Sequence, residues 1–168
     1  SEPLQAPDGF VIDNYKVPGS DGNPPVAVRV YRPEGIDEEA PSLIWIHGGG
    51  FVMGDISSAD ELCIGLAHHG QCAVVSVDYR LAPEHPFPAA ANDCFAGLEW
   101  LSSGSEEAGL KPAKIAVGGV SAGGGLAASM ALKTRDRKGP ELAHQFLIIP
   151  DVDDRLVTAS SHRIHDPR

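Results

Sequence analysis

Apolar residues in this chain gather in short runs, and turn-forming residues separate one run from the next. Three longer stretches have helical composition, from about residue 58 to 70, over 89–101 and over 122–135. Because strands that alternate with helices form parallel sheets covered on both faces, the pattern predicts an α/β fold with a mostly parallel sheet. About six runs have the character of strands, at Phe10–Val17, 26–31, Ser42–Ile46, 72–77, 114–118 and 145–149.

Local signals refine the boundaries of these elements. Residues 18–25 are rich in Gly, Pro, Asn and Asp between two strand-like runs, which predicts a hairpin near the start of the chain. Ser58 and Glu61 have the spacing of a capping box, so the first helix is predicted to begin at Ser58 and to end at Gly70. The continuous apolar run at 72–77 is typical of a strand buried on both faces.

Residues 119–123 read G-V-S-A-G, directly after one predicted strand and directly before a helical stretch. In this context a sharp turn exposes the serine at the end of the sheet as a nucleophile. Gly119 and Gly123 suit the turn, because only very small residues let strand and helix approach so closely. The pattern indicates Ser121 as a candidate nucleophile and the Ala122 N–H as a candidate oxyanion donor. A turn that serves close packing or phosphate binding is the alternative.

A second glycine motif, His47-Gly48-Gly49-Gly50, follows the predicted strand Ser42–Ile46. Such a loop supplies backbone N–H donors to an oxyanion hole, and glycines are required because side chains would block the acyl group. We expect Gly49 and Gly50 to supply these donors, and His47 to order the turn rather than to act as a base. An ordinary Gly-rich turn is the other interpretation, but the serine motif downstream favours acyl-transfer chemistry.

With these motifs the chain resembles the bacterial hormone-sensitive lipase family of α/β-hydrolases, a group of carboxylesterases and lipase-like enzymes. The resemblance also rests on residues 78–84 (D-Y-R-L-A-P-E), 87–89 (F-P-A), 121–124 (S-A-G-G) and 153–155 (D-D-R). It implies hydrolysis of short-chain acyl esters through a serine nucleophile, without a cofactor. Val120 is a departure, because members of the family often carry an acidic residue directly before the serine.

A serine hydrolase of this fold also needs a carboxylate and a histidine, which follow the serine in the chain. In the family the acid follows the seventh strand and the histidine the eighth, beyond the strands predicted here. We therefore expect residues 1–168 to form a partial α/β-hydrolase domain that lacks both segments and most of the cap, and that is weakly active or inactive alone. A non-catalytic binding module of this fold and an inactive truncated fragment remain alternatives.

The histidines near the end of the chain do not have the pattern of a catalytic base. An alternative triad is conceivable, because two histidines follow three aspartates shortly after the sixth predicted strand. No strand lies between the aspartates and the histidines to orient them, so we interpret all five as polar loop residues. They are Asp151, Asp153, Asp154, His162 and His165.

Composition disfavours several other classes of function. A net charge of -10 argues against a nucleic-acid partner. The glycines around Ser121 lack the phase of a dinucleotide-binding motif and the lysine of a P-loop. Cys63, Cys72 and Cys94 are too far apart in sequence for a paired metal site, so we expect buried free thiols in a reducing compartment. Since no apolar run approaches the length of a membrane span, we predict a cytoplasmic protein.

The last predicted strand would lie at an edge of the sheet. Its residues from Phe146 to Ile149 are apolar and carry no charge that would protect an unpaired edge. We expect this edge to be covered through self-association or by a second chain.

Overall fold

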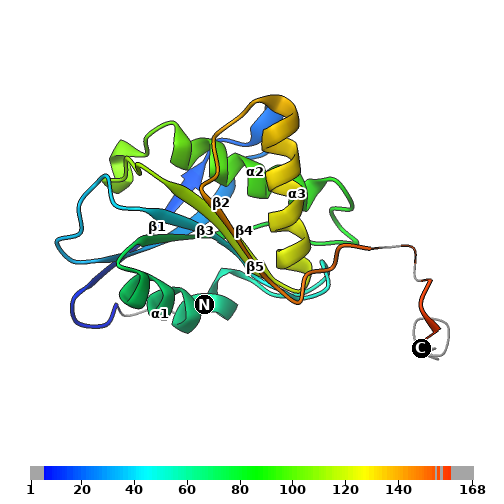
Figure 1. Cartoon of the computed structure of the whole chain (residues 1–168), viewed down its shortest axis with the longest axis horizontal. Coiled ribbons are helices and arrows are strands. Elements are labelled where there is room, and N and C mark those ends of the chain that lie inside the picture. The colour runs from blue at the N-terminus through cyan, green and yellow to red at the C-terminus, as the bar shows by residue number, and fades with distance from the viewer. Residues whose placement is uncertain (1–5, 154, 156, 160–168) are drawn as a thin grey trace.

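Six strands form one sheet in the order β1-β2-β4-β3-β5-β6 in the computed structural model, which describes residues 6–153, 155 and 157–159 (Figure 1). Strands β4, β3, β5 and β6 run parallel to one another, whereas the pairs β1 with β2 and β2 with β4 are antiparallel. The predicted α/β fold and the hairpin near the start of the chain are confirmed. The strands are β1 (Phe10–Val17), β2 (Val26–Pro33), β3 (Ser42–Ile46), β4 (Ala73–Asp78), β5 (Ile115–Val120) and β6 (His144–Ile148).

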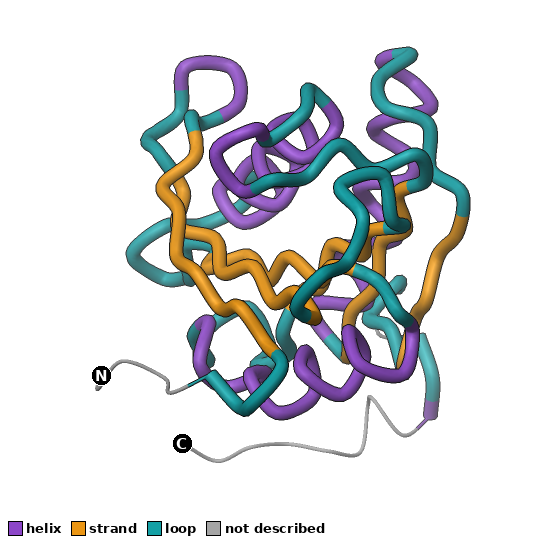
Figure 2. Tube along the Cα trace, turned by 90° about the vertical axis from the view of Figure 1, so that its left-hand side faces the viewer, coloured by secondary structure: helices purple, strands orange, loops and turns teal. Residues whose placement is uncertain are grey.

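Helices cover both faces of the sheet, as Figures 1 and 2 show. Helix α1 (Asp60–Gly70) lies on one face, and α2 (Ala89–Ser102) and α3 (Ala122–Arg137) lie on the other. Successive side chains of β3 alternate between the two cores: Trp45 packs in the cluster under α1, and Ile44 packs in the cluster under α2 and α3. Both are fully buried, which explains why the central strands have continuous apolar runs.

The register of β3 against β5 determines where the loops that follow them meet. Ser42 lies opposite Ile115, and Ile46 lies opposite Gly119, so the two parallel strands end at nearly the same level. Because parallel strands present their carboxyl ends at one edge of the sheet, residues 47 and 121 emerge side by side there. The two glycine motifs, which are distant in sequence, therefore share one edge of the sheet.

The start of α1 differs from the sequence prediction. Helix α1 begins at Asp60, and the residues before it form a 3₁₀ turn, Ile56–Ala59. The Asp55 side chain accepts hydrogen bonds from the backbone N–H groups of Ser57 and Ser58, at 2.9 and 3.0 Å, so Asp55 caps the turn. The hydrogen bond from the Ser57 hydroxyl is the largest influence that lowers the Asp55 pKa. The predicted capping box at Ser58 was wrong, because a carboxylate is the stronger acceptor.

Strand β6 forms one edge of the sheet within the described part of the chain. It pairs there only with β5, and Val120 lies opposite Ile148 at the end of the pair. Phe146 is 46% exposed, although its ring lies 6.2 Å from that of Trp45. The backbone turns directly after the strand, since Ile149 has a φ of +40°. This turn directs the next residues toward the start of α3.

Candidate active site

Ser121 lies between β5 and α3 with a backbone conformation that side-chain-bearing residues rarely adopt. Its φ and ψ are 54° and -120°. Three backbone hydrogen bonds hold this conformation: the Ser121 N–H donates to the Ile148 oxygen at 2.9 Å, and the Ser121 oxygen accepts from Gly125 and Asp151 at 3.0 and 3.2 Å. A strained serine fixed from two elements is typical of a functional position.

Two glycines allow the close approach of strand, helix and loop around Ser121. A Cβ at Gly123 would lie 2.1 Å from the carbonyl oxygen of Ile46, the last residue of β3. A Cβ at Gly119 would lie 2.4 Å from the carbonyl oxygen of Gly123. Because these neighbours are backbone atoms, any larger residue would push α3 away from the sheet.

The loop at residues 47–50 runs beside Ser121. A Cβ built on Gly48 would lie 3.6 Å from the Ser121 Cβ. The loop then turns tightly, since Gly49 and Gly50 have φ values of +124° and +61°. Within the described residues, no hydrogen bond is donated by the backbone N–H groups of Gly49, Gly50 and Ala122. These groups are therefore free to bind an acceptor from outside.

His47 is held within this loop rather than directed at the serine. Its ring is only 2% exposed and stacks on the Tyr79 ring, with centroids 4.3 Å apart. Nδ1 donates to the Gly48 carbonyl oxygen at 2.6 Å, because a carbonyl can only accept. The Tyr79 hydroxyl donates to the His47 carbonyl oxygen at 3.1 Å, and burial raises the pKa of this tyrosine, which keeps its proton. His47 and Tyr79 thus fix the loop, a role for Tyr79 that the sequence analysis did not anticipate.

An ion pair between Asp93 and Arg80 anchors the Pro-rich loop that forms the other wall of the site. The Asp93 carboxylate on α2 is 1% exposed and accepts from the Arg80 backbone N–H, Nε and Nη2 at 2.9, 2.8 and 2.7 Å. These hydrogen bonds raise the pKa of the Arg80 guanidinium. Arg80 begins the Pro-rich loop that ends at Pro88, so the pair fixes this loop on α2. Sequence reasoning gave Asp93 no role, although an acidic residue within an apolar helix is a signal of a buried partner.

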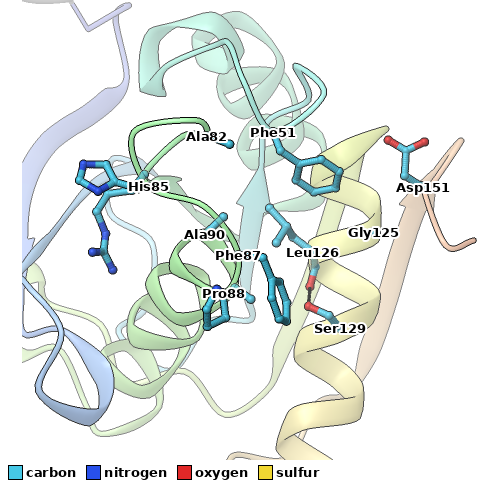
Figure 3. Close-up of a pocket in the computed structure, with 12 residues that line it drawn as sticks. Phe51, Ala82, His85, Phe87, Pro88, Ala90, Gly125, Leu126, Ser129 and Asp151 are labelled. Atoms are coloured by element: carbon cyan, nitrogen blue, oxygen red, sulfur yellow. Dashed lines mark hydrogen bonds between the residues drawn. The ribbon is translucent and has the colours of Figure 1, made fainter. Parts of the chain in front are cut away.

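Between this loop and α3 lies a cavity of about 280 Å³ (Figure 3). Its walls are mainly apolar, and Phe51, Leu126 and Phe87 lie side by side along it in Figure 3. Phe87 is 90% exposed at the rim. The Phe51 carbonyl oxygen accepts from the Ala82 N–H at 2.9 Å, which joins the two loops that line the cavity. The remaining lining residues are Arg80, Ala82, His85, Pro88, Ala90, Ala91, Gly125, Ser129 and Asp151.

Asp151 is an exposed loop residue, as interpreted from the sequence, and its carboxylate lies near the serine. Its Oδ2 lies 3.5 Å from the Ser121 Oγ, longer than the usual O–H···O distance of about 2.5 to 3.0 Å. Asp153 instead pairs with Arg155, at 2.6 Å between Oδ2 and Nη2. Asp154, His162 and His165 lie outside the described residues.

Within the described part of the chain, no histidine nitrogen forms a hydrogen bond with the Ser121 Oγ. No group of three or more His, Cys, Asp or Glu side chains gathers there as a metal site.

Among the described residues, no helix combines the length and the apolar character needed to cross a membrane. The three cysteines are free; Cys63 and Cys94 are buried as expected, whereas Cys72 is half-buried.

Comparison with known proteins identifies the family. The model of a family described as having the alpha/beta hydrolase fold matches residues 43–167. The chain belongs to this α/β-hydrolase family. The resemblance to carboxylesterases of the bacterial hormone-sensitive lipase type is also confirmed. The carboxylesterase NlhH of Mycobacterium tuberculosis is 44% identical over 132 residues, which are 79% of this chain and 41% of that protein.

Solved structures give the same result for this α/β-hydrolase chain. A bacterial heroin esterase superposes with a TM-score of 0.87 at 47% identity, covering 92% of this chain and 49% of that structure. The esterase from the archaeon Pyrobaculum calidifontis superposes with a TM-score of 0.79 at 44% identity, covering 84% and 44%. The chain thus spans less than half the length of these relatives.

Proposed function

We propose that this α/β-hydrolase chain carries the nucleophile and the oxyanion hole of a carboxylic ester hydrolase. The observation that carries the proposal is the strained Ser121 next to the loop at residues 47–50. Within the described residues, the backbone N–H groups of Gly49, Gly50 and Ala122 donate no hydrogen bond. Groups that are already oriented stabilise developing charge at no cost of reorganisation when the reaction occurs. The names of the relatives, carboxylesterase and esterase, support the same reaction class.

In the proposed reaction the Ser121 Oγ attacks the ester carbonyl carbon, and its proton passes to a base. The carbonyl oxygen becomes an oxyanion that the backbone N–H groups bind. The tetrahedral intermediate collapses, the alcohol leaves with a proton, and an acyl-serine remains. Water then attacks the acyl group and releases the carboxylic acid. The cavity of about 280 Å³ is suited to a short acyl chain.

We propose that the base and its orienting carboxylate come from residues other than 1–168, because in this fold both follow the serine on later strands. The His47 ring does not fit the role, because its Nδ1 is engaged by Gly48 and its ring is stacked on Tyr79. Without a base the serine keeps its proton. We therefore expect residues 1–168 alone to turn over esters weakly, with the residual activity that an oxyanion hole provides.

The proposal is tested on the full-length protein from the natural gene with p-nitrophenyl acetate and butyrate. Ser121→Ala should abolish turnover and also labelling by a fluorophosphonate, which mass spectrometry would locate on Ser121 in the parent. Ser102→Ala is the matched control, since the Ser102 hydroxyl is exposed and, among the described residues, donates to the Glu99 carbonyl oxygen alone. Turnover that survives in Ser121→Ala would overturn the proposal.

A further inference from the structure

Asp151 lines the cavity near Ser121, and its carboxylate has no cationic partner among the described residues. Arg80 also lines the cavity, but Asp93 matches its charge at 2.7 Å. Asp153 is matched by Arg155. Within the described residues no cation lies within 4.0 Å of the Asp151 carboxylate. His85 lines the cavity from the opposite side in Figure 3.

Asp151 stands where two hollows of the surface join. The cavity of about 280 Å³ and a second, outer hollow of about 530 Å³ share Phe51, Gly125, Ser129 and Asp151 in their walls. The outer hollow adds apolar side chains, with Leu132 and Val152 53% and 69% exposed. A ligand in this groove would therefore lie between apolar walls and beside the Asp151 carboxylate, which has no cationic partner among the residues that the structure describes.

Two backbone contacts anchor Asp151 at the start of α3. Its backbone N–H donates to the Ser121 carbonyl oxygen at 3.2 Å, and a Cβ on Gly125 would lie 2.3 Å from the Asp151 carbonyl oxygen. Segment 149–151 is thus pressed against the first turn of α3. From this position the Asp151 carboxylate lies 3.5 Å from the Ser121 Oγ.

We propose that Asp151 forms a subsite for an organic ammonium group, so that the site prefers esters with a cationic amine close to the scissile carbonyl. The preference among esters rests on the proposed function, whereas the binding of an ammonium group at Asp151 does not depend on it. An ammonium group at hydrogen-bond distance from Asp151 lies roughly two to four bonds from a carbonyl carbon that Ser121 attacks at about 3 to 3.5 Å. The exposed Phe51 ring in the same wall offers a face to alkylammonium groups.

The same carboxylate disfavours substrates with an acyl carboxylate, because two anions would then lie near the reacting serine. Asp151 is exposed, so water and salt screen its charge. We therefore expect a preference of about three- to tenfold for the cationic partner, which decreases at high salt.

The test has a kinetic and a binding arm, both on the full-length protein. The kinetic arm compares kcat/KM for the p-nitrophenyl esters of β-alanine and butyrate, which differ by an ammonium in place of a methyl group. The binding arm compares choline with its neutral isostere 3,3-dimethylbutan-1-ol, followed by NMR shifts of the Phe51 and Asp151 amides. Each arm uses the parent, Asp151→Asn, and Glu141→Gln as a control that removes one exposed carboxylate at the far end of α3.

The expected result is a preference for both cationic compounds in the parent and in Glu141→Gln, and none in Asp151→Asn. Equal binding of choline and its isostere by the parent, or a preference that persists in Asp151→Asn, would overturn the ammonium subsite. Absence of turnover for every ester, with binding of choline that still depends on Asp151, would overturn the ester hydrolase proposal and leave the subsite standing.

Discussion

Replacing Gly49 by alanine tests the loop proposed to hold the oxyanion. Gly49 has a φ of +124°, and a Cβ there would lie 2.0 Å from the Met53 carbonyl oxygen. The turn cannot absorb this contact unchanged, because the N–H groups of Val52 and Met53 both donate to the Gly49 carbonyl oxygen, at 3.1 and 3.0 Å. The turn at 49–53 must therefore open, and the Gly49 N–H loses its orientation.

Gly49→Ala should lose both turnover and stability, and two further glycine variants separate these effects. Loss of one oxyanion donor lowers turnover about 10²- to 10³-fold, or about 3 to 4 kcal/mol. A Cβ on a residue in the left-handed backbone region lowers the unfolding free energy by about 1 to 2 kcal/mol. Gly35→Ala isolates the strain, since Gly35 has a φ of +73° and a Cβ built there meets no described atom within 4 Å beyond its chain neighbours. Gly50→Ala should retain the turn and lose less turnover than Gly49→Ala, because Gly50 has a φ of +61° and its nearest neighbour is 4.0 Å away.

The assay measures kcat/KM for p-nitrophenyl acetate and thermal unfolding side by side, for the full-length parent and the three variants. Gly35→Ala should change stability alone, and Gly49→Ala should lose far more turnover than stability accounts for. Unchanged turnover in a folded Gly49→Ala protein would refute the oxyanion assignment. An equal loss in Gly35→Ala would attribute the effect to general strain.

Three further predictions concern the framework of the fold. Asp93→Asn should lower the unfolding free energy in urea by about 2 kcal/mol, because it weakens the hydrogen bonds of a buried carboxylate and leaves the half-buried Arg80 charge unmatched. A midpoint no lower than that of Asp136→Asn, which changes an exposed carboxylate, would contradict this. Burial raises the pKa of the Cys63 thiol to about 12 and also raises the pKa of the Cys94 thiol. A thiol reagent at pH 8 should therefore label neither cysteine until urea unfolds the protein. Rapid labelling of either cysteine in the native protein would contradict their burial. The edge of β6 should drive residues 1–168 to self-associate in sedimentation velocity, and a clean monomer at micromolar concentration would contradict this expectation.

Much of the framework follows from the sequence because its causes are local. The ranges Phe10–Val17 and Ser42–Ile46 were predicted with their observed bounds, since alternating or continuous apolar residues between turn formers leave few other arrangements. The serine between two glycines has a required backbone geometry that only small neighbours permit. The start of α1 was misplaced because two capping signals compete within four residues, and hydrogen bonding decides between them.

The fold class, the serine motif and the glycine loop can therefore be predicted from the sequence, because they depend on the order of segments and on spacing within each segment. Contacts between distant polar residues depend instead on the tertiary packing. Asp93 pairs with Arg80 because α2 packs beside the end of β4. Asp151 reaches Ser121 because Val120 lies opposite Ile148 and the chain turns at Ile149, which folds the next residues over the start of α3. Strand register and packing fix such contacts, and the pattern of a single segment contains neither.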